Sequence, residues 1–150
     1  LTDALSVEGI EIHYTDDASV CPTDADVIVY TPAIPQENKI IAYCRQQHMN
    51  LMKRSDILQV ISKGTFNICI AGTHGKTTTS TMVAHILRDT GFGCNAFLGG
   101  ISTNYHTNFW SDPNPVAVIE ADEYDRSFLK LFPDVISISS MDILIKRIHL

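Results

Sequence analysis

The stretch FNICIAGTHGKTTTSTMVAHILRDTG, residues 66–91, decides the fold of this chain. It opens with alternating apolar and polar residues, as a strand does, and a turn containing Gly72 and Gly75 follows. A helical pattern then runs from Lys76 to Gly91, a residue type that commonly ends helices. A strand, a glycine turn and a helix in this order are typical of a phosphate-binding loop.

Each residue type in the turn suits a phosphate ligand. Glycines let the backbone curl so that several N–H groups point inward, and the helix N-terminus adds a partial positive charge. Lysine supplies a full charge for the outer phosphates, and the following threonine hydroxyl can bind Mg²⁺. The candidate nucleotide-binding residues are Gly72, Thr73, His74, Gly75, Lys76, Thr77 and Thr78.

The match to the standard pattern G-x-x-x-x-G-K-[ST] is incomplete, because Ile70 stands where the first glycine would be. The alternative is an ordinary strand–turn–helix with a lysine on its surface. Three consecutive threonines, residues 77–79, argue against that alternative because β-branched residues are poor helix formers. Their hydroxyl groups make more sense if they face a ligand.

A second informative stretch is VAVIEADEYD, residues 116–125. A buried strand would bring Glu120 to its carboxyl end, where ligands bind in open α/β sheets. Asp122, Glu123 and Asp125 follow, and carboxylates this close repel one another unless a cation lies between them. The sequence therefore predicts a Mg²⁺ site formed by Glu120 and by Thr77, which follows the glycine turn. The alternative is that the four carboxylates belong to an acidic loop exposed to solvent.

Strands and helices are expected to alternate along the rest of the chain. The expected strands are residues 10–14, 27–31, 65–71, 94–98, 116–120 and 134–139. Pro35 should begin one helix and Ser55 should cap the next. In the helix after the glycine turn, the expected apolar stripe is Met82, Val83, Ile86 and Leu87. This order predicts an α/β fold with mainly parallel sheets, in two units that meet near residues 63–65.

Composition excludes several functional classes. The chain has 150 residues, 45% of them hydrophobic and 19% charged, which is an ordinary globular balance. A net charge of −6 argues against a nucleic-acid partner, and the lack of a long apolar run argues against a membrane partner. No leader segment is evident, so a cytoplasmic location is expected. The four cysteines form no C-x-x-C pair and are expected to be small buried residues.

The motifs GTHGKTTT and EADEYDRSFLKLFPD together resemble the Mur ligase family, including the shortened loop with Ile70. The stretches DADVIVYTPAIP, FLGGISTN and PDVISISSMD are also similar, so the resemblance covers residues 1–142. It implies that residues 1–64 are the end of a Rossmann-like UDP-binding domain. Residues 65–150 would be the front of a P-loop ATPase domain. The family's C-terminal domain would be absent, and the fragment alone would be inactive.

The resemblance also implies a reaction, the ATP-dependent ligation of L-alanine to the lactyl carboxylate of UDP-N-acetylmuramate in peptidoglycan biosynthesis. A carboxylate is a poor electrophile, and conversion to an acyl phosphate gives it a leaving group. Lys76 and His74 would be the catalytic residues, and Thr77 and Glu120 would bind Mg²⁺. Ser102 and Asn104 would contact the muramoyl group. ATP and Mg²⁺ are the implied cofactors.

Three alternatives remain open at this point. A murein tripeptide ligase of cell-wall recycling shares the central motifs. A P-loop kinase or GTPase is a second class, but the N-K-x-D motif of GTPases does not occur. A non-catalytic nucleotide-binding fragment is the third. The sequence also departs from the family after Asp142, because Ile145 stands where a metal-binding histidine is expected and His149 lies four residues further on.

Overall fold

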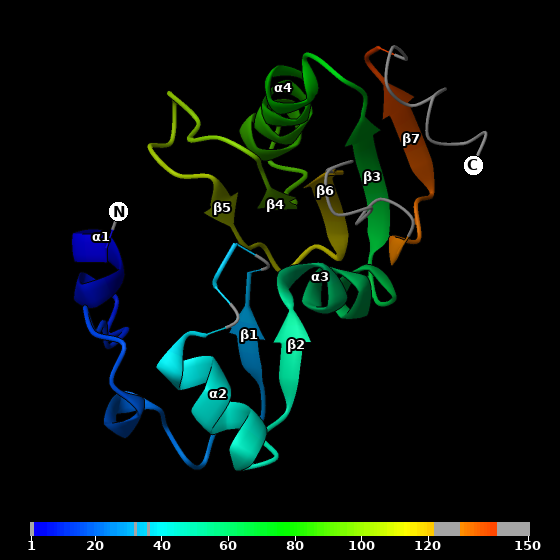
Figure 1. Cartoon of the computed structure of the whole chain (residues 1–150). Helices are drawn as coiled ribbons and strands as arrows, with labels where there is room; N and C mark the ends of the chain where they lie inside the picture. The colour runs from blue at the N-terminus through cyan, green and yellow to red at the C-terminus, as the bar shows by residue number, and fades with distance from the viewer. Residues whose placement is uncertain (1, 32, 36, 122–129, 141–150) are drawn as a thin grey trace. The chain divides into compact units, whose positions relative to one another are not determined.

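The structure is a computed structural model that describes residues 2–31, 33–35, 37–121 and 130–140 (Figure 1). The chain divides into two compact units, Leu1–Ile57 and Leu58–Leu150. The division falls within helix α3, Arg54–Ser62, rather than at residues 64–65. Leu58 explains this earlier position, because its side chain packs against the hydrophobic core of the second unit.

The first unit contains a two-stranded parallel sheet in which Ile28 lies opposite Leu51. Its buried side chains are few, and they include Cys21, Ile41 and Cys44. The Sγ atoms of Cys21 and Cys44 lie 3.4 Å apart. Its elements are α1 (Thr2–Val7), the 3-10 helix η1 (Ala18–Val20), β1 (Ile28–Tyr30), α2 (Lys39–Gln46) and β2 (Leu51–Lys53).

Several expectations for this unit were wrong in detail. Residues 10–14 form no strand and join neither sheet of the described residues. Helix α2 begins after Asn38 instead of at Pro35, since the Asn38 side chain accepts a hydrogen bond from the Ile41 N–H at 3.2 Å. Ser55 lies inside α3 and is buried, so it does not cap that helix. The short strand β2 was not predicted.

The second unit is built on a five-stranded sheet in the order β5-β4-β6-β3-β7 (Figure 1). Its pairings are parallel except that between β4 and β5. The predicted α/β class with mainly parallel sheets is therefore confirmed. The elements after α3 are β3 (Phe66–Ala71), α4 (Lys76–Asp89), β4 (Asn95–Phe97), β5 (Phe109–Trp110), β6 (Val116–Glu120) and β7 (Val135–Ile138).

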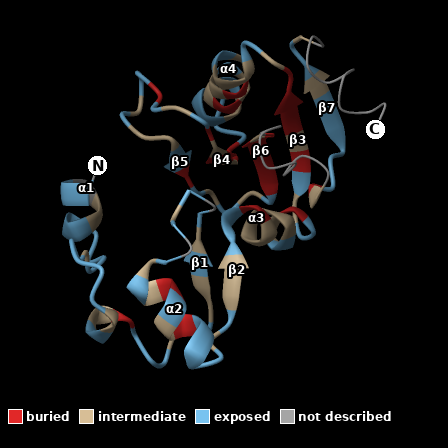
Figure 2. Ribbon diagram, viewed as in Figure 1, coloured by how far each residue is buried: buried red, intermediate tan, exposed pale blue. Residues whose placement is uncertain are grey.

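The two central strands of this sheet, β3 and β6, are buried on both faces (Figure 2). On one face, Ile70 and Val118 pack in a cluster with Ala84 of α4. On the other face, Cys69 and Ile119 pack in a second cluster with Leu58 of α3. Successive side chains of a strand point to opposite faces, so both faces need a cover. This burial fixes the register in which Glu120, the last residue of β6, lies opposite Ile70 near the end of β3.

Helix α4 uses small residues to approach the sheet. Ser80 and Ala84 are fully buried, whereas Met82 and Ile86 are 59% and 57% exposed. The predicted apolar stripe was therefore wrong for those two residues. Val83 and Leu87 belong to the flank of the buried cluster, as partly buried side chains. The small buried face lets the start of α4 lie close to the end of β6.

The four cysteines are all buried free thiols, as the sequence predicted. Burial raises the pKa of the Cys69 thiol to about 11, and the nearby Asp134 carboxylate acts in the same direction. Burial, with the hydrogen-bonded Cys21 beside it, also raises the pKa of Cys44 to about 11. At neutral pH the Cys44 and Cys69 thiols are protonated, and they serve as small apolar side chains.

Candidate functional site

The glycine turn between β3 and α4 forms an open loop. Gly72 has φ 125° and Gly75 has φ 78°, backbone conformations that other residues rarely adopt. Gly72 must also lack a side chain, because a Cβ atom there would lie 2.8 Å from the Ser140 backbone nitrogen. Gly75 is the N-cap of α4, and no described side chain caps it. The N–H groups of the first helical turn have no partners within the helix, so they suit an anion.

The loop lines a pocket of about 370 Å³. The residues around it are Thr73, His74, Gly75, Lys76, Thr77, Thr78 and Glu120. Six of the seven predicted nucleotide-binding residues thus face one cavity, together with the predicted metal-binding carboxylate. Gly72 is not among the lining residues, and its positive φ forms the bend of the loop. The structure therefore brings together residues that are more than 40 positions apart in the sequence.

Lys76 lies along the loop. Its Nζ atom donates a hydrogen bond to the Gly72 carbonyl oxygen at 2.6 Å. The ammonium group is therefore held at the edge of the pocket that the lysine also lines. A positive charge in this position can neutralise phosphate oxygens that enter the pocket.

Glu120 is held by three groups from two segments, helix α4 and the turn after β4. Its Oε1 accepts a hydrogen bond from the Thr77 hydroxyl at 3.0 Å. Its Oε2 accepts one from the Gly99 N–H at 2.8 Å and a longer one from the Ser80 hydroxyl at 3.4 Å. Gly99 must be glycine for this contact, because a Cβ atom there would lie 2.6 Å from the Glu120 carboxyl carbon. The carboxylate is consequently oriented by its neighbours.

The pair formed by Thr77 and Glu120 fits a magnesium ion. Magnesium takes oxygen ligands in an octahedron at about 2.1 Å, so adjacent ligands lie about 3 Å apart. The Thr77 Oγ1 and Glu120 Oε1 atoms have this separation, 3.0 Å. The described residues contain no group of three or more His, Cys, Asp or Glu side chains that could hold a metal. A phosphate oxygen and water would therefore have to complete the coordination of an ion at this pair.

The predicted substrate residues Ser102 and Asn104 lie in the loop after Gly100, outside the lining of the pocket. Ser102 is buried, its N–H donates to the Thr107 carbonyl, and its hydroxyl oxygen has no hydrogen-bond partner among the described atoms. Asn104 is exposed. The loop approaches the start of α4 at Gly100, where a Cβ atom would lie 3.0 Å from Thr77 Cγ2.

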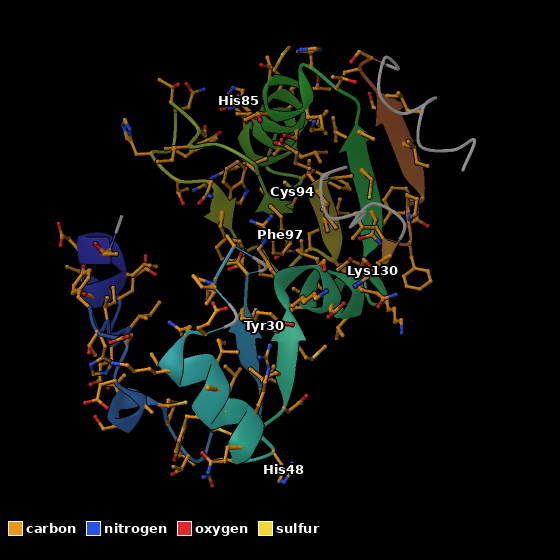
Figure 3. The ribbon with its side chains drawn as sticks, viewed as in Figure 1. Tyr30, His48, His85, Cys94, Phe97 and Lys130 are labelled. Carbon is orange, nitrogen blue, oxygen red and sulfur yellow. The ribbon has the colours of Figure 1, made fainter. Side chains whose placement is uncertain are left out.

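The same loop is anchored on helix α4. The His85 Nδ1 atom lies 2.6 Å from the Tyr105 hydroxyl oxygen, and Arg88 stacks over the Tyr105 ring at 4.4 Å. Figure 3 labels His85 on the flank of α4, next to this loop. Tyr105 also packs edge-on against Trp110 of β5. These contacts fix the loop that contains Ser102 and Asn104 to helix α4, which begins at the glycine turn.

Sequence reasoning missed Ser80 and Gly99 as partners of Glu120. The Gly99–Gly100 pair after a strand was the available signal for one of them, and nothing in the sequence indicated the other. The predicted carboxylates Asp122, Glu123 and Asp125 lie outside the described residues, as do Ile145 and His149 in the tail. In the part of the chain that the structure describes, no helix is long and apolar enough to cross a membrane.

Comparison with known proteins finds similarity to one family along the chain. Residues 1–65 match the model of the Mur ligase family, catalytic domain, and this match ends just before the glycine turn. The chain is 47% identical over 95% of its length to a UDP-N-acetylmuramate–L-alanine ligase from Cytophaga hutchinsonii. A protein of the same name from Porphyromonas gingivalis is also 47% identical over 95% of the chain. The chain spans about a third of the length of these relatives, 32% of each.

Two solved structures show the same arrangement of elements. A UDP-N-acetylmuramate-alanine ligase from Thermotoga maritima superposes with a TM-score of 0.82 at 31% identity, over 91% of this chain and 32% of that one. A UDP-N-acetylmuramate:L-alanyl-gamma-D-glutamyl-meso-diaminopimelate ligase from Neisseria meningitides superposes with a TM-score of 0.81 at 25% identity. That match covers 93% of this chain and 48% of the other.

Proposed function

This chain is a relative of the Mur ligases over 95% of its length, and on that premise we propose that the whole protein is an ATP-dependent ligase. It joins L-alanine to the lactyl carboxylate of UDP-N-acetylmuramate, in peptidoglycan biosynthesis. The observation that supports this most is the 47% identity to ligases named for these two substrates, combined with a phosphate loop whose Thr77 faces Glu120. A cytoplasmic location, where ATP and amino acids are available, belongs to the same proposal.

The proposed reaction has two steps. The substrate carboxylate attacks the terminal phosphorus of ATP, and the bond to ADP breaks, which gives an acyl phosphate. The amine of L-alanine then forms a C–N bond at the acyl carbon and loses a proton, while phosphate leaves with the C–O electron pair. Bound Mg²⁺–ATP supplies the phosphoryl group and the metal's positive charge. The protein contributes alignment and electrostatic stabilisation.

The residues around the pocket divide this work. Backbone N–H groups at the start of α4 would bind phosphate oxygens, and the Lys76 ammonium would neutralise the transferred group. Thr77 and Glu120 would hold Mg²⁺, with Ser80 and Gly99 orienting the carboxylate. His74 lines the pocket and is the second candidate for contact with the reacting groups. Ser102 and Asn104 remain candidates for the muramoyl group.

The domain assignment is part of the proposal. Residues 1–64 would belong to the domain that binds the UDP-sugar, and residues 65–150 to the ATPase domain that contains the phosphate loop. A tripeptide-adding ligase is the second candidate, because the Neisseria meningitides structure shares the fold at a TM-score of 0.81. The L-alanine-adding activity is preferred, since relatives named for it reach 47% identity, against 25% for that structure.

The test is phosphate release by the full-length protein that contains this chain. The reaction holds UDP-N-acetylmuramate and Mg²⁺–ATP, with either L-alanine or the tripeptide L-alanyl-γ-D-glutamyl-meso-diaminopimelate as acceptor. We expect release with L-alanine, and none when any one substrate is omitted. Release with the tripeptide but not with L-alanine would show that the protein is the tripeptide-adding ligase instead. No release with either acceptor would contradict the ligase proposal.

A further inference from the structure

The carboxyl end of β7 contacts the back of the phosphate loop through two serines. The Ser140 hydroxyl oxygen accepts hydrogen bonds from the Thr73 and His74 N–H groups, both at 3.0 Å. The Ser139 N–H donates to the Ala71 carbonyl at 3.0 Å, which extends the pairing of β7 with β3 beyond the strands. The two serines are more than 60 positions from the loop in the sequence, so local structure does not account for these contacts.

The Ser139 hydroxyl binds the loop at a second point. It lies within hydrogen-bond distance of the His74 carbonyl and, at 3.2 Å, of the Ala71 carbonyl. A hydroxyl has one hydrogen to donate. Because the His74 carbonyl is the nearer of the two acceptors, the hydroxyl hydrogen is assigned to it. His74 is therefore held through both its N–H and its carbonyl group.

Close packing accompanies these hydrogen bonds. A Cβ atom on Gly72 would lie 2.5 Å from the Ser139 Oγ atom and 3.0 Å from the Ser139 nitrogen. The first glycine of the loop is thus required by β7 as well as by its own φ of 125°. Neither serine lines the pocket. Any effect of the pair on a ligand therefore passes through the loop.

We propose that Ser139 and Ser140 are positioning residues that set the shape of the phosphate loop for nucleotide binding. Ser140 accepts hydrogen bonds from the Thr73 and His74 N–H groups of the loop. The N–H groups at the start of α4 then remain directed at the pocket, because the segment that leads into the helix is fixed. The inference rests on the proposed function, since it concerns how the loop is prepared for Mg²⁺–ATP.

The test compares single variants of the full-length protein. Ser140→Ala removes both bonds to the loop, and we expect the KM for ATP to rise about tenfold, from the loss of two ordinary hydrogen bonds. We expect kcat and the KM for L-alanine to stay within about threefold of wild type. Ser140→Thr retains the hydroxyl and should restore the KM for ATP. Ser137→Ala, in strand β7 just before the two serines, is the matched control and should leave the KM for ATP unchanged.

Two further measurements keep the outcomes distinct. Calorimetric titration with ADP and Mg²⁺ should show the same tenfold weakening in Ser140→Ala, and it needs no ligase activity. If the wild type binds ADP but releases no phosphate, the proposed function fails while this titration still tests the serines. Unchanged ADP affinity in Ser140→Ala would overturn the inference. The inference would also be overturned if Ser140→Ala lowered the thermal stability of the protein and raised the KM of every substrate by the same factor.

Discussion

At Gly99 the absence of one methyl group makes room for the Glu120 carboxylate, the proposed magnesium ligand. The Gly99 N–H donates to Glu120 at 2.8 Å, and the carboxyl group occupies the space that a Cβ atom would need. Thr77 and Ser80 contact the same carboxylate from α4. A carboxylate held in this way presents its Oε1 atom to the pocket without losing side-chain freedom when an ion binds.

The substitution Gly99→Ala tests this arrangement. The added methyl group must displace the Glu120 carboxylate, so we expect the Mg²⁺ concentration for half-maximal activity to rise by about tenfold or more. The measurement is phosphate release by the full-length protein over a magnesium titration. Gly64→Ala is the control, because a Cβ atom there has its nearest neighbour at 3.8 Å and needs no displacement. An unchanged magnesium requirement in Gly99→Ala would show that the glycine contact does not orient Glu120.

At the scale of elements, strand β3 is tied to its neighbours by one buried amide. The Asn67 Nδ2 atom lies within hydrogen-bond distance of the carbonyl oxygens of Ser62, Thr65 and Phe132, at 2.6, 2.9 and 2.8 Å, and its two hydrogens are shared among the three. Its Oδ1 atom accepts from the Thr65 hydroxyl at 2.7 Å. These partners belong to the end of α3, the turn into β3 and the approach to β7. One side chain therefore aligns the strand that leads into the phosphate loop.

Replacement of Asn67 by Ala should destabilise the protein by about 3 kcal/mol, because it leaves carbonyl groups buried without donors. The measurement is urea unfolding of the purified chain, with the free energy of unfolding taken from the transition. Asn50→Ala is the comparison, since its side chain is exposed and donates one bond of 3.3 Å. We expect that variant to change stability by less than about 0.5 kcal/mol. If the two substitutions lowered the free energy of unfolding by the same amount, Asn67 would have no particular role in stabilising β3.

At the scale of the whole molecule, the two units differ in how much they bury. The second unit has two apolar clusters, one on each face of a five-stranded sheet. The first unit has a two-stranded sheet whose strands are at best half-buried. Two-stranded sheets are marginally stable by themselves. The unit that contains the phosphate loop should therefore be the more stable of the two.

Hydrogen exchange measures this difference directly. We expect amides of β3 and β6 to exchange at least about tenfold more slowly than those of β1 and β2, because local opening is easier where little apolar surface is buried. The measurement is deuterium uptake by the native protein, followed by mass spectrometry of its peptides. The four strands provide their own internal comparison. Equal protection in all of them would mean that the two units open as one.

The sequence alone determined the α/β class, the position of each central strand, and the loop that faces the pocket. These features are local, because alternation marks a strand and a glycine pair marks a sharp turn within a few residues. The position of Glu120 followed in the same way from the end of a buried strand. Local patterns were therefore sufficient to predict that Thr77 and Glu120 form a pair.

Only the tertiary structure decided what surrounds that pair. Ser80 and Ala84 are the buried face of α4, although Met82 and Ile86 are the more apolar residues, because the helix lies close to the sheet. The contact of Gly99 with Glu120 and that of Ser140 with the loop join residues more than 20 positions apart. Periodicity and turn signals describe neighbours along the chain. They give no information about which separate segments the sheet order brings together.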